Sequence, residues 1–158
     1  MQTDWHRAPY LISTDPARID VPAVHAYLSG SYWAEGIPLA LVTRSIAGSL
    51  PFGIYQGKDQ VGFARVVTDR ATFAYLADVY VLESHRGKGL SKWLMEVILA
   101  HPGLQGLRRF LLATRDAHGL YRLFGFTPLA KPEAFMEIAE LGLYTRSEKA
   151  GRGDGGAH

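Results

Sequence analysis

The strongest constraint on the fold of this chain is a run of three β-rich segments between residues 50 and 82. "LPFGIYQG", "QVGFARVVT" and "TFAYLADVYVL" are rich in β-branched and aromatic residues, and only two or three residues separate them. Such short connections join antiparallel strands, because parallel neighbours need a crossover of a dozen or more residues. The sequence therefore predicts an antiparallel meander.

The third of these segments is apolar on both of its alternating faces, as expected of a central strand covered on both sides. Strict alternation puts Phe73, Tyr75, Val79 and Val81 on one face and Leu76, Tyr80 and Leu82 on the other. Asp78 is the charge that interrupts the second set. Burial of a carboxylate is costly unless it is paired or used. Asp78 is therefore a candidate for a structural hydrogen bond or for catalysis.

Helical patterns lie on both sides of the meander. Two helices are predicted before it, over residues 21–28, with Asp20 as the N-cap, and over residues 38–47. A third is predicted over residues 90–100, where apolar residues recur at i, i+3, i+4, i+7 and i+8 before "HPG" ends the helix. These patterns predict an α+β domain.

The remaining predicted elements are short. "YLIS" at residues 10–13 predicts an edge strand after an irregular start, and "LRRFLLAT" predicts a strand before the short helix "AHGLYRLF", which Asp116 can cap. "FTPL" and "EAFMEI" are candidates for closing strands. The glycine-rich end predicts a flexible tail over residues 146–158, after a domain of residues 1–145.

Composition excludes several classes of protein. The chain of 158 residues suits one domain, and its net charge of +2 gives no nucleic-acid footprint. It has no cysteine, and its six histidines lack the i, i+4 spacing of a helical metal site, so no metal is expected. No secretory segment and no apolar run of about 18 residues occurs, which indicates a cytoplasmic protein without a membrane partner.

The stretch "HRGKGLSKWL" has the chemistry of an anion site. Free backbone N–H groups at a helix N-terminus bind anions, and glycines allow the close approach. Arg86, Lys88 and Lys92 add cations around the same turn. The spacing fits neither the P-loop nor the G-x-G-x-x-G dinucleotide turn, since Lys92 stands at the position of the third glycine.

This turn and a later segment resemble the two signatures of a known protein family. "VYVLESHRGKGLSKWLM" is similar to the acetyl-CoA signature of the GNAT acyltransferase superfamily, an apolar strand followed by [RQ]-x-x-G-x-[GA] at the start of a helix. Arg86, Gly89 and Ser91 occupy its defining positions, with Ser91 in place of Gly or Ala. "AHGLYRLFGFTPL" resembles the second signature, A-x-x-x-Y-x-x-x-G-F, through Ala117, Tyr121, Gly125 and Phe126.

The resemblance implies both a fold and an activity. The fold would be a single GNAT-like domain of α/β/α layers, with a mixed, mostly antiparallel sheet whose central strands splay apart and are flanked by helices. The activity would be transfer of an acetyl group from acetyl-CoA to a primary amine, on a small molecule rather than a protein, by a monomer or homodimer. A non-catalytic acyl-CoA-binding or regulatory module is the alternative, and a longer acyl donor stays open.

By the same resemblance, the glycine turn would hold the pyrophosphate of coenzyme A, and the pantetheine arm would follow the third β segment. Thr114 stands where the family often has the asparagine that contacts pantetheine. The residues expected to bind acetyl-CoA are Val79, Tyr80, Val81, Arg86, Gly87, Lys88, Gly89, Leu90, Ser91, Lys92, Thr114 and Tyr121.

Acyl transfer to an amine needs a base, a group that polarises the thioester carbonyl and an acid for the leaving thiolate. The resemblance implies the backbone N–H of Val81 for the second task and Tyr121 for the third. Asp78 and Glu83 are the candidate bases; His85, His118 or a water relay are alternatives. The acceptor would contact the connection between the two N-terminal helices, through Tyr32, Trp33 and Glu35.

Overall fold

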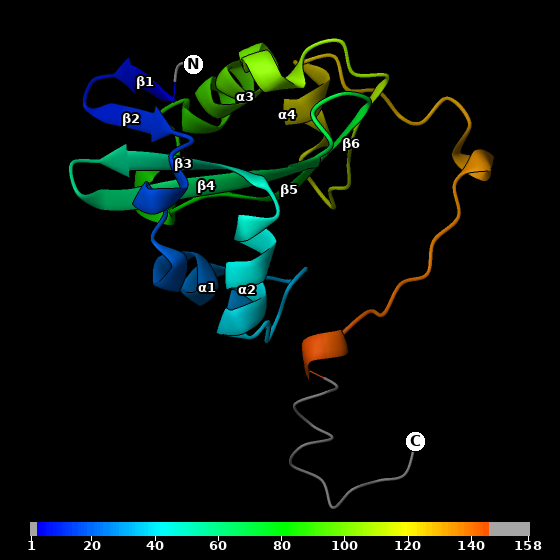
Figure 1. The fold of residues 1–158 in the computed structure, drawn as a ribbon, viewed down its shortest axis with the longest axis horizontal. Helices are drawn as coiled ribbons and strands as arrows, with labels where there is room; N and C mark the ends of the chain where they lie inside the picture. Colours follow the sequence, from blue (N-terminus) through cyan, green and yellow to red (C-terminus); the bar gives the residue numbers. More distant parts are fainter. Residues whose placement is uncertain (1–2, 146–158) are drawn as a thin grey trace, which may run out of the picture. The chain divides into compact units, whose positions relative to one another are not determined.

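The computed structural model describes residues 3–145. These residues form two compact units, one made of the chain up to residue 20 together with residues 45–127, and the other of residues 21–44 together with the chain from residue 128. Figure 1 shows the elements of both.

The first unit is built on a six-stranded sheet whose strands lie in the order of the sequence. Neighbours are antiparallel from β1 to β5, and β5 pairs with β6 in parallel. The predicted meander and the mixed, mostly antiparallel sheet are therefore confirmed. The strands are β1 (Asp4–Arg7), β2 (Tyr10–Ser13), β3 (Leu50–Gln56), β4 (Asp59–Thr68), β5 (Phe73–Val81) and β6 (Arg109–Leu112).

One edge of the sheet differs from the prediction. The first nine residues were expected to be irregular, but β1 pairs along the whole of β2 and takes the edge position assigned to "YLIS". Trp5 packs against the core, whereas His6 and Arg7 are exposed. An edge strand with one apolar residue in four gives too weak an alternation to be recognised in the sequence.

The core of this unit lies between the sheet and α3 (Leu90–Ala100), which Figure 1 shows beside the strands. α3 is confirmed at the predicted position, and it buries one apolar side of the helix among residues of β2 to β5. The buried residues of α3 are Leu90, Trp93, Leu94, Met95, Val97 and Ile98.

β5 contains a bulge that changes which residues share a face. Phe63 pairs with Tyr80, but Arg65 pairs with Ala77, so two residues of β5 oppose one residue of β4. Asp78 lies in the bulge in a left-handed conformation, with φ of 56°. Val79 and Val81 consequently join Ala74 and Leu76 on the side packed against α3, and the strict alternation expected from the sequence is wrong beyond Ala77.

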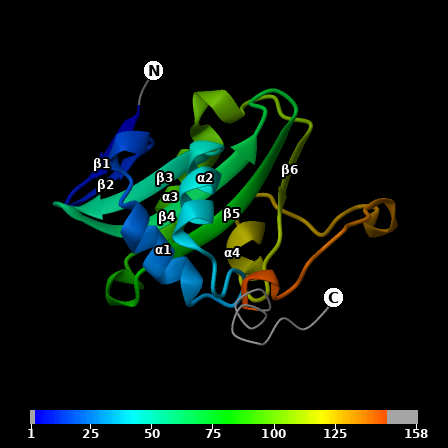
Figure 2. The same cartoon turned by 60° about the horizontal axis from the view of Figure 1, so that its bottom comes forward.

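β5 has a neighbour on only one side over its second half. β6 pairs with residues 73–76 of β5 and with no later residue, so the strand from Ala77 to Val81 has β4 alone as a partner. Figure 2 shows β6 beside the start of β5 and moving away from it farther along. This divergence is the splay that the family resemblance implies.

The helix α4 (His118–Arg122) follows β6 and is shorter than predicted. Asp116 does not cap it; the backbone N–H of Ala117 donates to Oγ1 of Thr114 at 3.1 Å. Asp116 instead makes an exposed ion pair with Arg115. This hydrogen bond closes the turn that precedes the helix, a local contact that threonine favours, and α4 has no side-chain cap.

The second unit holds the two N-terminal helices, α1 (Val21–Ser29) and α2 (Leu39–Ala47), both at their predicted positions. Residues 45–47, the last three of α2, belong to the first unit. Nε2 of His25 lies 3.0 Å from the carbonyl oxygen of Ile37, which ties α1 to the segment before α2. Thr145 lies against Gly36 of the same connection.

The predicted closing strands are absent. Residues 127–142 form no strand, contain a short 3-10 helix at Pro132–Ala134, and are all exposed. "FTPL" and "EAFMEI" lack a strand neighbour among the described residues, so their alternating pattern does not produce a ladder. The tail predicted at residues 146–158 lies outside the described residues. Between residues 3 and 145, no helix has the length and hydropathy needed to cross a membrane.

Candidate functional site

The glycine turn leads directly into α3. Gly87 and Gly89 have φ of 77° and 75°, a region that favours glycine, and Gly89 is the N-cap of the helix. The first intrahelical bond runs from the N–H of Trp93 to the carbonyl oxygen of Gly89. The preceding N–H groups therefore have no acceptor within the helix. A Cβ at either glycine would meet no atom within 4 Å, so the space above the turn is open.

Positive charge surrounds this helix end. Lys88 and Lys92 are exposed, and Nε of Arg86 donates to the carbonyl oxygen of Val81 at 2.9 Å. That hydrogen bond fixes the turn against the end of β5. Backbone donors, the helix dipole and three cations together favour a ligand that carries phosphate.

The end of β5 presents its backbone to the gap left by β6. Val81 pairs with Gly62, and the N–H of Leu82 donates to the carbonyl oxygen of Val61. This pattern makes Val81 and Gly62 a non-hydrogen-bonded pair, whose N–H and C=O groups point away from the partner strand. The N–H of Val81 is therefore directed to the side on which β6 no longer pairs.

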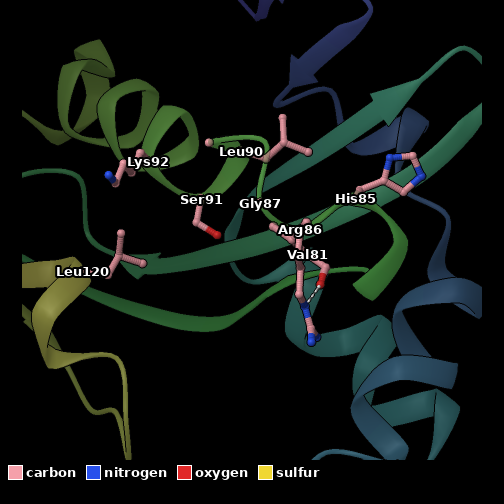
Figure 3. A pocket seen from close by; sticks show the side chains of 9 residues that line it. Val81, His85, Arg86, Gly87, Leu90, Ser91, Lys92 and Leu120 are labelled. Atoms are coloured by element: carbon pink, nitrogen blue, oxygen red, sulfur yellow. Dashed lines mark hydrogen bonds between the residues drawn. The ribbon is translucent and has the colours of Figure 1, made fainter.

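The turn and the end of β5 border one cavity of about 350 Å³. Figure 3 shows the side chains around it, with Arg86 joined to Val81 by the hydrogen bond. The structure thus brings together most of the residues expected to bind acetyl-CoA. The lining residues are Val81, His85, Arg86, Gly87, Gly89, Leu90, Ser91, Lys92 and Leu120.

Two of these residues have features that the sequence did not reveal. His85 is held by Tyr10 of β2, whose hydroxyl lies 2.9 Å from Nδ1 and whose ring meets the imidazole edge-on. Seventy-five positions separate the two residues, and no local pattern connects them. Leu120 reaches the cavity from α4, where the sequence had singled out its neighbour Tyr121.

Tyr121 lies in the core of the first unit. It is 8% exposed, and its ring contacts that of Phe126 at 5.9 Å between centroids. Tyr121 and Phe126, two residues of the second signature, are therefore packed together at the end of α4. Thr114, whose Oγ1 accepts from Ala117, precedes the same helix and is partly buried.

The two candidate bases have different surroundings. Asp78, in the bulge of β5, accepts from Nε of Arg65 on β4, and the side chains of this pair are only 9% and 20% exposed. Arg65 also donates to Oγ of Ser49 at 3.2 Å. Glu83, by contrast, is exposed in the 3-10 turn Glu83–His85 that joins β5 to the glycine turn. His118 is exposed at the start of α4.

The residues expected to contact the acceptor lie in the second unit, between α1 and α2. Tyr32 and Trp33 are exposed, and their rings meet edge-on at 5.1 Å between centroids. Tyr27 of α1 lies next to Trp33, at 6.4 Å. Glu35 is exposed in the same turn. Across residues 3–145, no three His, Cys, Asp or Glu side chains gather as a metal site would require.

Comparison with known proteins gives the class to which this site belongs. A model of the GNAT family of acetyltransferases matches residues 19–126, which include the sheet from β3 to β6, the glycine turn and both signatures. The chain belongs to the GNAT family. The fold and the expected class of enzyme, an acetyl-CoA-dependent acetyltransferase, are therefore confirmed.

Individual relatives agree with this assignment. An acetyltransferase of Gibberella zeae is 35% identical, and the match covers 75% of this chain and 78% of that protein. The crystal structure of a GNAT-family acetyltransferase from Xanthomonas campestris pv. campestris is 55% identical, with a TM-score of 0.85 over 86% of this chain and 96% of the other.

A more distant structure, an acetyltransferase from Clostridium acetobutylicum crystallised with acetyl-CoA, has a TM-score of 0.60 at 13% identity. The alignment covers 82% of this chain and 94% of that one. At this identity the likeness concerns the fold alone.

Proposed function

We propose that this protein is an N-acetyltransferase that moves the acetyl group of acetyl-CoA directly to a primary amine of a small molecule. The observation that carries the proposal is the shared cavity. There, the open N-terminus of α3 meets the end of β5, where Val81 directs its backbone away from β4. One end of this cavity suits a pyrophosphate and the other suits a thioester carbonyl.

Each end has a distinct binding task. The N–H groups from Gly87 to Lys92 would hold the pyrophosphate, while Arg86, Lys88 and Lys92 would add charge. The pantetheine arm would lie along the part of β5 that carries Val79, Tyr80 and Val81, where β6 no longer pairs, and its amides would pair with backbone groups such as those of Val81 that point away from β4. The hydroxyl oxygen of Thr114 accepts a hydrogen bond from the N–H of Ala117. The hydroxyl proton of Thr114 is therefore still available for donation.

The reaction forms a bond between the amine nitrogen and the carbonyl carbon, and breaks the bond between that carbon and sulfur. The N–H of Val81 would stabilise the negative charge that develops on the carbonyl oxygen. The proton that the amine loses passes to a base, and the leaving thiolate takes a proton from the hydroxyl of Tyr121. The products are an N-acetyl amine and coenzyme A.

Two carboxylates compete for the role of base. Glu83 is exposed beside the end of β5, so it can accept a proton through water. Asp78 is engaged by the Arg65 guanidinium in an ion pair with little exposure, so its carboxylate already has a structural partner. The dependence of kcat on pH in Glu83→Gln and Asp78→Asn separates the two candidates. The variant that lacks the base should no longer show the fall of kcat at acidic pH that protonation of the base causes.

The aromatic turn of the second unit would bind the acceptor. Tyr32 and Trp33 offer exposed ring faces to a cation, and Glu35 adds a negative charge to the same turn. This combination favours an amine that is protonated in solution. Trp33→Ala should therefore raise KM for the acceptor and leave the KM for acetyl-CoA unchanged.

The test is calorimetry with acetyl-CoA, followed by measurement of free thiol across a panel of amines. Because the chain has no cysteine, a thiol reagent detects coenzyme A alone. We expect binding of acetyl-CoA, and amine-dependent thiol release with at least one class of amine. Absence of binding contradicts the whole proposal, and binding without turnover over a broad panel favours a non-catalytic acyl-CoA-binding module.

We assign catalysis to residues 1–145 and a cytoplasmic location, where acetyl-CoA is supplied. A chain that ends at residue 145 should keep the kcat of the full chain; a large loss would assign part of the function to residues 146–158.

A further inference from the structure

A hydrogen bond from β2 reaches the segment that precedes the glycine turn. Tyr10 of β2 is 8% exposed, and its hydroxyl lies 2.9 Å from Nδ1 of His85. The two rings also meet edge-on, at 5.8 Å between centroids. In the sheet, β3 and β4 lie between β2 and β5, so this contact joins the segment after β5 to a strand that is not its neighbour.

The other hydrogen bonds of this segment are local. The N–H of His85 donates to the carbonyl oxygen of Leu82 at 2.9 Å, and the N–H of Arg86 donates to that of Glu83 at 3.2 Å. Each acceptor lies three residues before its donor, so these bonds shape the segment without attaching it to another element. Tyr10 supplies such an attachment.

The glycine turn itself is open. Gly87, Lys88 and Gly89 are exposed, and a Cβ at either glycine would meet no atom within 4 Å. Glycine also has more conformational freedom to lose than any other residue. The place of the turn therefore depends on its two ends, which are α3 in the core and His85 on the other side.

The cavity connects this anchoring with ligand binding. His85 borders the cavity together with the glycines, but Figure 3 shows its imidazole pointing away from Ser91 and Lys92. The imidazole is held by Tyr10 instead, and Tyr10 does not border the cavity. Donors that are in place before a ligand arrives bind it more tightly, because less conformational entropy is lost.

We propose that Tyr10 is a positioning residue for acetyl-CoA, which acts through His85: their hydrogen bond holds the glycine turn in the conformation that receives the pyrophosphate. This inference rests on the proposed function, because it needs the pyrophosphate at the turn. It adds a residue of β2 that lies outside both signatures and outside residues 19–126, which the family model matches. Loss of the Tyr10 hydroxyl should raise KM for acetyl-CoA and leave kcat unchanged.

The first test is calorimetry with coenzyme A and, at millimolar concentration, with pantetheine, which has no pyrophosphate. Tyr10→Phe keeps the ring and removes the hydroxyl. We expect it to weaken coenzyme A binding about three- to tenfold, the net contribution of one hydrogen bond. Its affinity for pantetheine should stay as in the wild type. Unchanged affinity for coenzyme A, or equal losses for the two ligands, overturns the proposal.

Tyr55→Phe is the matched control. Tyr55 lies on β3, is 4% exposed, donates its hydroxyl proton to the carbonyl oxygen of Arg18 at 2.8 Å, and does not border the cavity. Each variant therefore loses one hydrogen bond of a nearly buried phenol. We expect both to unfold at lower urea concentration and only Tyr10→Phe to lose affinity for coenzyme A. Equal losses of affinity would leave Tyr10 a role in stability alone.

Substitutions of His85 show whether Tyr10 acts through it. His85→Asn keeps a hydrogen-bonding atom near the place of Nδ1, and should bind coenzyme A more tightly than His85→Phe, which has none. When combined with Tyr10→Phe, the two should bind alike. An asparagine that has no advantage, or keeps its advantage without the Tyr10 hydroxyl, overturns the proposal.

The last measurement needs no ligand. The N–H groups of His85 and Arg86 are hydrogen-bonded, and their exchange with solvent, followed by NMR, should be faster in Tyr10→Phe than in the wild type or Tyr55→Phe. Equal exchange in the three proteins overturns the positioning role, even where coenzyme A binds. A wild type that binds no coenzyme A overturns the proposed function and this inference with it, so the two failures are distinguishable.

Discussion

At the scale of single residues, Tyr121 has an observed packing role and a proposed chemical one. Its ring contacts Phe126 in the core, and the phenol group would supply a proton to the leaving thiolate. Tyr121→Phe keeps the ring and removes the hydroxyl. We expect kcat to fall about 10²- to 10⁴-fold, the range typical of general acid–base assistance.

Calorimetry serves as the control for this variant, because the affinity for acetyl-CoA should stay within a factor of about three. A kcat equal to that of the wild type would leave Tyr121 with a packing role only. A parallel loss of affinity and fold stability would point to the same conclusion.

His101 is a second residue whose role depends on its surroundings. It is 2% exposed between Trp5 and Phe52, and its Nδ1 accepts from the N–H of Gly103 at 2.9 Å. Burial, and then the nearby charge of Arg70, lower the pKa of His101 below its usual range. The folded protein therefore holds this imidazole neutral, whereas the unfolded chain protonates it near pH 6.5.

The consequence is a loss of stability in acid. Because the folded pKa is the lower one, the unfolded chain binds more protons, so the contribution of His101 is complete above pH 6.5 and declines as the pH falls below it. We expect the free energy of unfolding to decrease from pH 7 to pH 5. His101→Asn keeps an acceptor for Gly103 without a titrating group, and should show a flatter dependence in urea titrations. Equal slopes for both proteins would contradict this assignment.

At the scale of elements, the glycine turn allows a matched comparison. Gly89 and Gly106 have nearly the same φ, 75° and 71°, and at both a Cβ would meet no atom within 4 Å. Gly106 precedes β6 and takes no part in the cavity. Alanine at either position should cost about 1 kcal/mol of stability, through the left-handed backbone.

Only the substitution at Gly89 should affect the ligand, since its Cβ enters the space proposed for the pyrophosphate. We expect Gly89→Ala to weaken acetyl-CoA binding at least about tenfold, or 1.4 kcal/mol, in calorimetry. Gly106→Ala should bind as the wild type does. Equal affinities for the two variants would place the phosphate elsewhere.

The ion pair that spans β4 and β5 gives the next prediction at this scale. Asp78→Asn keeps a residue that tolerates the left-handed bulge, but leaves the Arg65 guanidinium without its carboxylate. Loss of one partner of a buried pair typically costs about 3–5 kcal/mol, and we expect the lower end here because Arg65 retains Ser49. Chemical denaturation measures the loss; Glu83→Gln, at an exposed site, should unfold as the wild type does.

The sequence predicted the elements whose patterns are local. β3, β4 and β5 follow from alternation and short turns, and α3 follows from helical spacing. The glycine turn was recognisable because its residues are consecutive. The bulge at Asp78 was not recognisable in the sequence. One inserted residue changes the face of Val79 and Val81 without any break in the apolar pattern.

Long-range contacts set the other limit of prediction from sequence. Nothing local connects Tyr10 with His85, or Asp78 with Arg65, because each pair depends on which strands are neighbours. The segment "EAFMEI" at residues 133–138 is the opposite case. Its alternating pattern predicts a strand, but a strand also requires a neighbouring strand, which the pattern does not specify.

At the scale of the whole molecule, the ligand should stabilise the fold to which it binds. Acetyl-CoA at about 100 times its Kd adds about 2.7 kcal/mol, provided that the unfolded chain does not bind it. For a chain of this size, 1 kcal/mol corresponds to about 2–4 °C, so we expect Tm to rise by roughly 5–10 °C. S-acetylpantetheine, which lacks the pyrophosphate, should give a much smaller shift at the same concentration. Equal shifts would remove the glycine turn from the binding site.

The bulge in β5 also determines how this gene can change. Deletion of one residue from a paired strand normally turns every later side chain to the opposite face. In β5 one extra residue is already present, so deletion of Asp78 would restore a regular ladder with β4 and leave Val79 and Val81 on the side of α3. The shortened strand would lose the ion pair with Arg65 but keep the wall that Val81 gives to the cavity. This strand should therefore tolerate the loss of a residue at the bulge better than a loss anywhere else along its length.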